Sequence, residues 1–238
     1  MTHINLYRTV LAPALMAQGF WVRRRTPRLP EPAGYRSGRW GSGPDMRLLI
    51  AGDSSAAGVG VARQEKALSG RLVSQLGEHR RVSWTLVART GALTADVVEM
   101  LGRVPSGDYD IAVTALGVND ITERVPLDTW LDQTEELHDV LTARFKVRRI
   151  IASGLPPLES FPLLPQPLRW YLGREARNFD EALRKRLAGK PNVEHLPMVD
   201  FPRDGNLLAS DGYHPGEEIY ETWAKWVARR CLNADTQH

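Results

Sequence analysis

From residue 46 onward, short apolar runs alternate with longer segments in which apolar residues recur at helical spacing. The runs have the length and apolar content of buried strands. The predicted strands cover residues 48–52, 82–87, 111–116, 149–152 and 193–198, and the predicted helices cover residues 65–76, 94–101, 127–145, 170–187 and 217–232. Connections that hold a helix between successive strands are typical of a parallel sheet covered on both faces. The pattern therefore predicts an α/β fold.

The first predicted strand stops at a serine among small residues. Ser54 follows Gly52-Asp53, and the small residues 56–58 leave its hydroxyl group approachable. In open α/β sheets, ligands bind beyond the carboxyl ends of the strands, because the loops diverge there and leave a crevice. Ser54 is therefore the candidate nucleophile. Ser55 is the adjacent rival, and the position at the strand end favours Ser54.

Three more polar segments lie at the ends of strands or directly before the last helix. Gly91 follows the second strand, Asn119 follows the third, and Asp211-Gly212-Tyr213-His214 precedes the final helix. Together with Gly52-Asp53-Ser54, these blocks occur in the order found in the SGNH hydrolases, also called the GDSL esterase/lipase superfamily. The chain resembles this superfamily over roughly residues 46–232. Because all the blocks occur in order, the resemblance is far more specific than a single Gly-Asp-Ser.

The resemblance implies both a fold and a set of site residues. The expected fold is a three-layer α/β/α sandwich, flavodoxin-like, with five parallel strands in the order 2-1-3-4-5. The expected oxyanion hole consists of the backbone N–H groups of Ser54 and Gly91 and the side-chain amide of Asn119. His214 is the expected catalytic base.

The residue types at the last block support the same chemistry. A serine hydroxyl is a poor nucleophile until a base takes its proton, and His214 is the base that we select. Asp211 lies three residues earlier, and Gly212 permits a turn that brings the carboxylate to the imidazole. Asp211 would then orient His214 and leave the other ring nitrogen for Ser54. The alternative, in which Asp211 caps the following helix, remains open.

Other polar residues near these blocks are predicted to have structural roles. Thr94 is placed to cap the helix that follows it, and Asp53 and Asp120 are expected to fix their turns through hydrogen bonds. Neither Asp53 nor Asp120 belongs to an Asp-x-Asp spacing or a histidine cluster that would support a metal site, and no Gly-Lys-Ser/Thr ending supports a phosphate-binding loop.

A proline-rich apolar loop, residues 155–167, follows the fourth predicted strand. It is expected to form a wall of an acyl pocket. The substrate-contacting candidates in it are Leu155, Leu158, Phe161 and Leu163. Packing of the loop against its own domain is the alternative, and the two roles are compatible.

The amino-terminal part of the chain differs from the rest. The formal net charge is +3, but residues 1–47 hold eight arginines against only Glu31 and Asp45, so the remainder is net negative. No nucleic-acid partner is therefore expected. Residues 1–45 are expected to be a tail, with a Pro/Gly/Arg-rich extended connector of little regular structure over 26–45, and residues 46–238 the hydrolase domain.

Two interpretations of the apolar segment Val10 to Val22 remain open. It is too short to span a bilayer and is followed by Arg23-Arg24-Arg25. It is either an interfacial anchor that contacts anionic head groups, giving peripheral membrane contact, or a helix packed on the domain's own surface, which we favour. The single cysteine, Cys231, excludes a disulfide framework within the chain, and a cytoplasmic location is expected.

The predicted activity is hydrolysis of short- to medium-chain carboxylic esters through an acyl-enzyme. The substrate is a small-molecule ester, and no metal or organic cofactor is required. The oligomeric state is not predicted. Acyl transfer, or hydrolysis of thioesters or lysophospholipids at the same site, remains open, as does a binding module with an inactive site.

Overall fold

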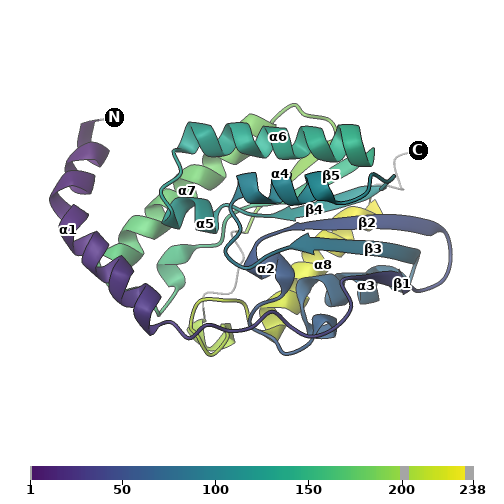
Figure 1. Cartoon of the computed structure of the whole chain (residues 1–238), viewed down its shortest axis with the longest axis horizontal. Helices are drawn as coiled ribbons and strands as arrows, with labels where there is room; N and C mark the ends of the chain where they lie inside the picture. Colours follow the sequence, from purple (N-terminus) through teal and green to yellow (C-terminus); the bar gives the residue numbers. More distant parts are fainter. Residues whose placement is uncertain (1, 199–203, 234–238) are drawn as a thin grey trace.

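A computed structural model describes residues 2–198 and 204–233. Its centre is a six-stranded sheet in the order β1-β3-β2-β4-β5-β6 (Figure 1). The strands are β1 (Ser37–Trp40), β2 (Asp45–Gly52), β3 (Arg81–Ala88), β4 (Ile111–Ala115), β5 (Arg149–Ser153) and β6 (Val193–Leu196). Strands β2 to β6 run parallel to one another, and the order of these five strands is the predicted 2-1-3-4-5.

Helices cover both faces of the sheet. Helices α3 and α8 pack together on one face, and α4, α6 and α7 lie on the other (Figure 1). The longer helices are α1 (Thr2–Arg25), α3 (Leu68–Gly77), α4 (Thr94–Arg103), α6 (Leu127–Phe145), α7 (Leu168–Leu187) and α8 (Glu217–Asn233). Single turns are formed by α2 (Ser54–Ala57), α5 (Val118–Thr122), η1 (Gln64–Lys66), η2 (Leu158–Ser160) and η3 (Gly205–Leu207). The fold is thus the three-layer α/β/α sandwich that the sequence predicts.

The strand register places the carboxyl ends of β2, β3, β4 and β5 at the same level. Gly52, the last residue of β2, pairs with Ala88 of β3 on one side and with Ala115 of β4 on the other. Ala115 in turn pairs with Ser153 of β5. Because these parallel strands end at the same level, the segments that follow β2, β3 and β4 emerge side by side at one edge.

The first strand is an addition to the predicted fold. Residues 37–40 lie within the connector for which little regular structure is expected, yet they pair antiparallel with β3. All four residues of β1 are exposed, so no burial pattern marks the strand in the sequence. Gly38 lies beneath the ring of Trp84, where an added Cβ would be 2.5 Å from the ring. Backbone pairing with the edge of β3 and this close approach, rather than side-chain burial, explain the strand.

The amino-terminal helix is longer than predicted and packs against α7. Leu15 is buried, and the Gln18 side chain donates to the carbonyl oxygen of Gln166 (2.6 Å) and accepts from the N–H of Leu168 (3.0 Å). The favoured interpretation, a helix packed on the domain, is therefore confirmed. Within the described ranges, no helix combines the length and apolar character needed to cross a membrane. Contact of α1 with a membrane surface stays a prediction.

A buried histidine in α6 makes the fold sensitive to acid. His138 is buried, and neither ring nitrogen has a hydrogen-bond partner among the described residues. Burial, assisted by nearby Lys190 and opposed by Glu135, lowers the pKa of His138 from 6.5 to about 4. Because the unfolded chain binds this proton first as the pH falls, stability is expected to drop by about 3 kcal/mol between about pH 6.5 and pH 4.

Urea unfolding of the wild type and of His138→Leu at pH 7 and pH 4.5 checks this expectation. The variant should lose less stability than the wild type over this interval. His79→Leu, which makes the same change at an exposed histidine, is the control and should behave as the wild type. Equal acid sensitivity of the wild type and His138→Leu would contradict the prediction.

Candidate active site

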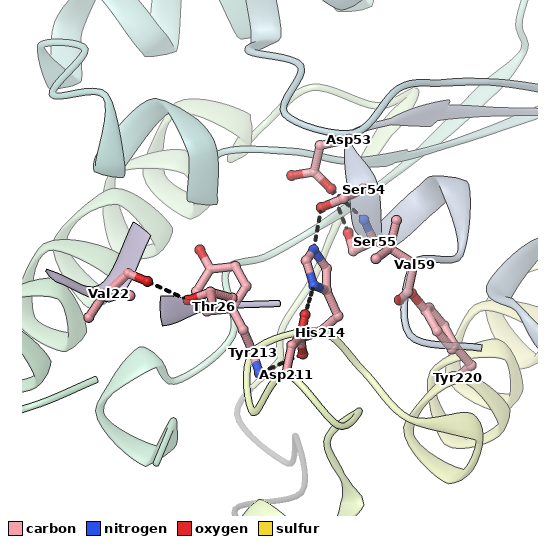
Figure 2. Close-up of polar contacts among 10 residues, drawn as sticks. All are labelled: Val22, Thr26, Asp53, Ser54, Ser55, Val59, Asp211, Tyr213, His214 and Tyr220. Atoms are coloured by element: carbon pink, nitrogen blue, oxygen red, sulfur yellow. Dashed lines mark hydrogen bonds and ion pairs between the residues drawn. The ribbon is translucent and has the colours of Figure 1, made fainter. Parts of the chain in front are cut away.

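Three of the predicted residues form one hydrogen-bonded chain (Figure 2). Ser54 opens α2 directly after β2, and His214 lies on the loop before α8, so the fold joins residues 160 positions apart. The Nε2 atom of His214 is 3.0 Å from the Oγ atom of Ser54, and its Nδ1 atom is 2.5 Å from Oδ2 of Asp211. A carboxylate only accepts hydrogen bonds, so Nδ1 carries the proton and Nε2 of the neutral ring accepts from the serine hydroxyl.

The carboxylate of Asp211 is held by its own loop. Its side chain is fully buried, and Oδ1 accepts from the backbone N–H groups of Tyr213 and His214, both at 3.0 Å. Burial alone raises the pKa of Asp211, but the hydrogen bonds from His214 and the backbone outweigh it, so the net pKa is lowered. Gly212 makes the turn with a φ of +65°. The N–H groups that bond to Asp211 all precede Glu217, where α8 begins. This disfavours the alternative in which Asp211 caps α8.

The neighbouring serine has a different partner. The hydroxyl of Ser55 donates to Oδ1 of Asp53 (2.7 Å), and its backbone N–H donates to the same atom (2.9 Å). Asp53 therefore caps α2 and fixes the turn, as predicted. Burial raises the pKa of Asp53 above its ordinary value. Since the hydroxyl of Ser55 is engaged by Asp53, Ser54 is the serine that faces His214.

A second buried carboxylate anchors the turn after β4. Asp120 accepts at Oδ1 from the N–H of Thr94 (3.1 Å) and at Oδ2 from its hydroxyl (3.0 Å). The prediction that Thr94 caps α4 is wrong, because Thr94 is the first residue of that helix and Asp120 supplies the acceptor at its start. Trp130 donates to the Thr94 hydroxyl (3.1 Å), and burial raises the pKa of Asp120. The predicted turn-fixing role of Asp120 is confirmed.

Two of the three predicted oxyanion donors, Gly91 and Asn119, lie on adjacent turns. Asn119, in α5, donates one hydrogen of its amide to the carbonyl oxygen of Ala92 (3.0 Å), which leaves the second amide hydrogen for another acceptor. This bond ties α5 to the turn that contains Gly91, whose φ is +76°. Gly117 precedes α5 with a φ of +115°, and an added Cβ would be 2.9 Å from the Trp130 ring. The donor roles of Ser54, Gly91 and Asn119 stay predictions.

Two cavities meet at His214. The smaller, of about 60 Å³, lies against Ser54 and is bounded by residues such as Met198 and Trp223. The larger cleft, of about 1300 Å³, shares Asn119, Tyr213 and His214 with the small cavity and extends under α1. We call it the α1 cleft. Its walls are α1, residues 26–31, α5 and the segment 163–172.

The predicted acyl contacts need correction. Of the four candidates, Leu163 lines the α1 cleft, whereas Leu155, Leu158 and Phe161 are buried in the hydrophobic core and line neither cavity. The turn η2, which lies within this loop, packs on α7. Phe161 instead contacts the ring of Tyr213 edge-on, with centroids 5.6 Å apart, and thus supports the loop that carries His214.

Residues of α1 at the cleft are the main group that sequence reasoning missed. They lie far from the motif blocks along the chain, and the path of the connector brings them close. Ala33 bridges to Arg63, and Glu31 accepts from the N–H and hydroxyl of Thr90. These contacts return the tail to the site, and no local pattern in the sequence signals them.

Comparison with known proteins places the chain in a family. Residues 50–222, well over half of the chain, match the model of the GDSL-like lipase/acylhydrolase family. A GDSL-like esterase of Mycobacterium tuberculosis is 29% identical over 190 residues, which cover 74% of this chain and 58% of that protein. The chain therefore spans less than two thirds of the length of this curated relative.

Solved structures share the fold at low identity. A psychrotrophic esterase from Pseudoalteromonas sp. is 15% identical with a TM-score of 0.60 over 79% of this chain and 100% of that one. An extracellular lipase from Streptomyces rimosus is 17% identical with a TM-score of 0.61 over 77% and 99%. At such identities the comparison supports the architecture, and the chemistry must be argued from the site.

Proposed function

Because the chain belongs to the GDSL-like lipase/acylhydrolase family, we propose that it hydrolyses carboxylic esters of short- to medium-chain acyl groups through an acyl-enzyme. The single observation that carries this proposal is the continuous hydrogen-bond chain from Ser54 through His214 to Asp211. In this chain, the imidazole of His214 is the base for Ser54, and Asp211 orients that imidazole. Both are required for nucleophilic catalysis by a serine.

The proposed reaction has two halves. In the first, Oγ of Ser54 bonds to the ester carbonyl carbon while Nε2 of His214 takes its proton, and the alcohol leaves with that proton. In the second, water attacks the acyl group, His214 takes the water proton and returns it to Ser54, and the carboxylic acid leaves. Asp211 stabilises the imidazolium that forms in each half.

During each attack, negative charge develops on the carbonyl oxygen of the substrate and must be stabilised by hydrogen-bond donors. The free amide hydrogen of Asn119 and the backbone N–H groups of Ser54 and Gly91 are proposed for this role. The Asp120–Thr94–Trp130 contacts hold α5 beside α4, so the amide of Asn119 is held in place before substrate arrives. Such preorganised donors commonly contribute the largest share of rate enhancement.

A fluorophosphonate probe together with p-nitrophenyl acetate tests the proposal. The folded chain is expected to release p-nitrophenol and to take up one probe molecule, found on Ser54 by peptide mass analysis. The Pseudoalteromonas esterase has been solved inhibited by monoethylphosphonate, which supports a phosphonate as the probe. The same chain unfolded in urea is the control and should not react. If the chain showed neither hydrolysis nor labelling, it would instead be a binding module with an inactive site.

Acyl transfer is separated from hydrolysis by the acceptor. With methanol added, a hydrolase keeps carboxylic acid as its main product, whereas a transferase forms methyl ester at the expense of acid. The release of p-nitrophenol reports the first half-reaction in both cases, so the product ratio alone decides.

A further inference from the structure

Half of the residues that line the α1 cleft come from a part of the chain outside the family match. That match begins at residue 50, whereas α1 ends at Arg25. Just past that end, the Thr26 hydroxyl donates to the carbonyl oxygen of Val22 (2.7 Å; Figure 2). Both residues line the cleft, as does Tyr213. The opposite wall is apolar and comes from the start of α7 and the residues before it, including Leu163, Leu164 and Leu168.

We propose that α1 is part of the substrate site and that the α1 cleft receives the apolar acyl chain of the ester. This inference rests on the proposed ester hydrolysis. It assigns the length preference of the enzyme to the amino-terminal helix together with the end of the proline-rich loop, which faces it across the cleft. It also extends the preference toward acyl chains longer than the small cavity beside Ser54 can hold.

The position of the cleft relative to the reacting atoms supports an acyl occupant. His214 and Asn119 both line it, and both also line the small cavity against Ser54, so the cleft adjoins the base and the proposed carbonyl-oxygen donor. The acyl chain is attached to the carbonyl carbon and therefore starts at the same place. Small-molecule sites commonly enclose about 300 to 1,000 Å³. At about 1300 Å³ the α1 cleft exceeds what an acetyl group needs, whereas the small cavity offers only about 60 Å³.

Apolar side chains of α1 border the cleft without being buried. Met16 is 57% exposed and Phe20 63% exposed, although both line the cleft wall. Leu15 of the same helix, by contrast, is buried in the core. An acyl chain lying along this wall would remove both side chains from water, which favours binding of apolar ligands.

A glycine in the middle of α1 keeps this wall open. Gly19 lines the cleft, and an added Cβ would have no atom within 4 Å. Glycine is a poor helix former, so helix stability does not explain its presence. The absence of a side chain here leaves room between α1 and the facing wall.

Polar contacts along α1 hold it at its distance from the domain. Gln18 is fixed to the start of α7 through Gln166 and Leu168, and Arg23 forms an ion pair with Glu123 after α5 (2.5 Å). The ion pair also neutralises two charges at the cleft, because both residues line it. These contacts fix the position of α1 without filling the α1 cleft.

Filling the cleft at Gly19 tests the inference. We compare kcat/KM for p-nitrophenyl acetate and p-nitrophenyl octanoate in the wild type and in Gly19→Leu. The open space at Gly19 and the better helix propensity of leucine keep the variant folded. Each methylene that the cleft buries is worth up to about fourfold in kcat/KM. The octanoate-to-acetate ratio is therefore expected to fall at least tenfold in Gly19→Leu, mainly through KM.

Ala17→Leu is the matched control, since Ala17 is an exposed residue of α1 that is not among the residues lining the cleft. Its ratio should equal that of the wild type. An unchanged ratio in Gly19→Leu, or an equal loss on both esters, would overturn the inference. A loss of activity in Gly19→Leu that is confined to acetate esters of longer alcohols would also overturn the inference, because the cleft would then hold the alcohol leaving group.

A binding measurement separates this inference from the proposed chemistry. Dodecanoate is titrated calorimetrically into the wild type and Gly19→Leu, and binding should weaken at least tenfold in the variant. If acetate is hydrolysed but neither the ratio nor dodecanoate binding changes, only the acyl assignment fails. If the wild type hydrolyses no ester and takes up no fluorophosphonate, the proposed function fails and the inference fails with it.

Discussion

Ser54→Ala is expected to lower kcat for p-nitrophenyl acetate by at least about a thousandfold. Its hydroxyl is the group that His214 Nε2 reaches, and no acyl-enzyme can form without it. The protein should stay folded, because alanine is the best helix former and Ser54 is the first residue of α2. Steady-state kinetics with circular dichroism as the folding check provide the measurement.

Ser55→Ala is the matched control for this result. It removes the same atom one residue away, where the hydroxyl donates to Asp53. Activity should persist within a few-fold, with a stability loss of about 1 kcal/mol for the missing hydrogen bond. Full activity in Ser54→Ala together with loss in Ser55→Ala would exchange the two roles.

Asp211→Asn is expected to lower kcat by about a thousandfold or more while leaving the fold intact. The two backbone N–H groups that bond to Oδ1 would hold the amide oxygen of the asparagine in that position. The amide nitrogen would then face Nδ1 of His214, which would have to accept instead of donate. The ring proton would move to Nε2, which could no longer take the proton from Ser54.

Kinetics of Asp211→Asn at neutral pH check this expectation, because the lowered pKa of Asp211 keeps the wild-type carboxylate ionised there. Asp204→Asn makes the same change at an exposed carboxylate, which accepts from the N–H of Asn206 in η3, and should keep wild-type kcat. Activity of Asp211→Asn within tenfold of wild type would show that Asp211 does not orient the imidazole.

The sequence predicts the parallel part of the sheet well, because burial there leaves a direct trace. Residues 48–51 are fully buried and therefore read as an uninterrupted apolar run. Strand β1 leaves no such trace, since it is exposed and is held by backbone pairing with β3. The cap of α4 is missed for a related reason. Its acceptor, Asp120, is distant along the chain, whereas Thr94 is the local candidate.

The Ser54–His214–Asp211 chain could be predicted because its members lie in two short motif blocks, one at the end of β2 and one directly before α8. The substrate walls could not. Leu158 and Phe161 have the composition of a pocket wall, but the same composition suits a core, and the structure places them there. The cleft depends on how α1 and the connector return to the site, which is a tertiary property.

Strand β1 also determines where the chain can be cleaved without exposing an edge of the sheet. It covers the edge of β3, whose backbone groups would otherwise be free to pair with a strand of another molecule. The strand itself is a poor template for such pairing, since it is only four residues long, fully exposed and carries Arg39. Cleavage of the chain at residue 45 would therefore uncover a long, aggregation-prone edge, whereas cleavage before Ser37 would leave the sheet protected. The edge of β3 is thus covered by a segment that lies outside residues 46–238, the domain defined by the motifs.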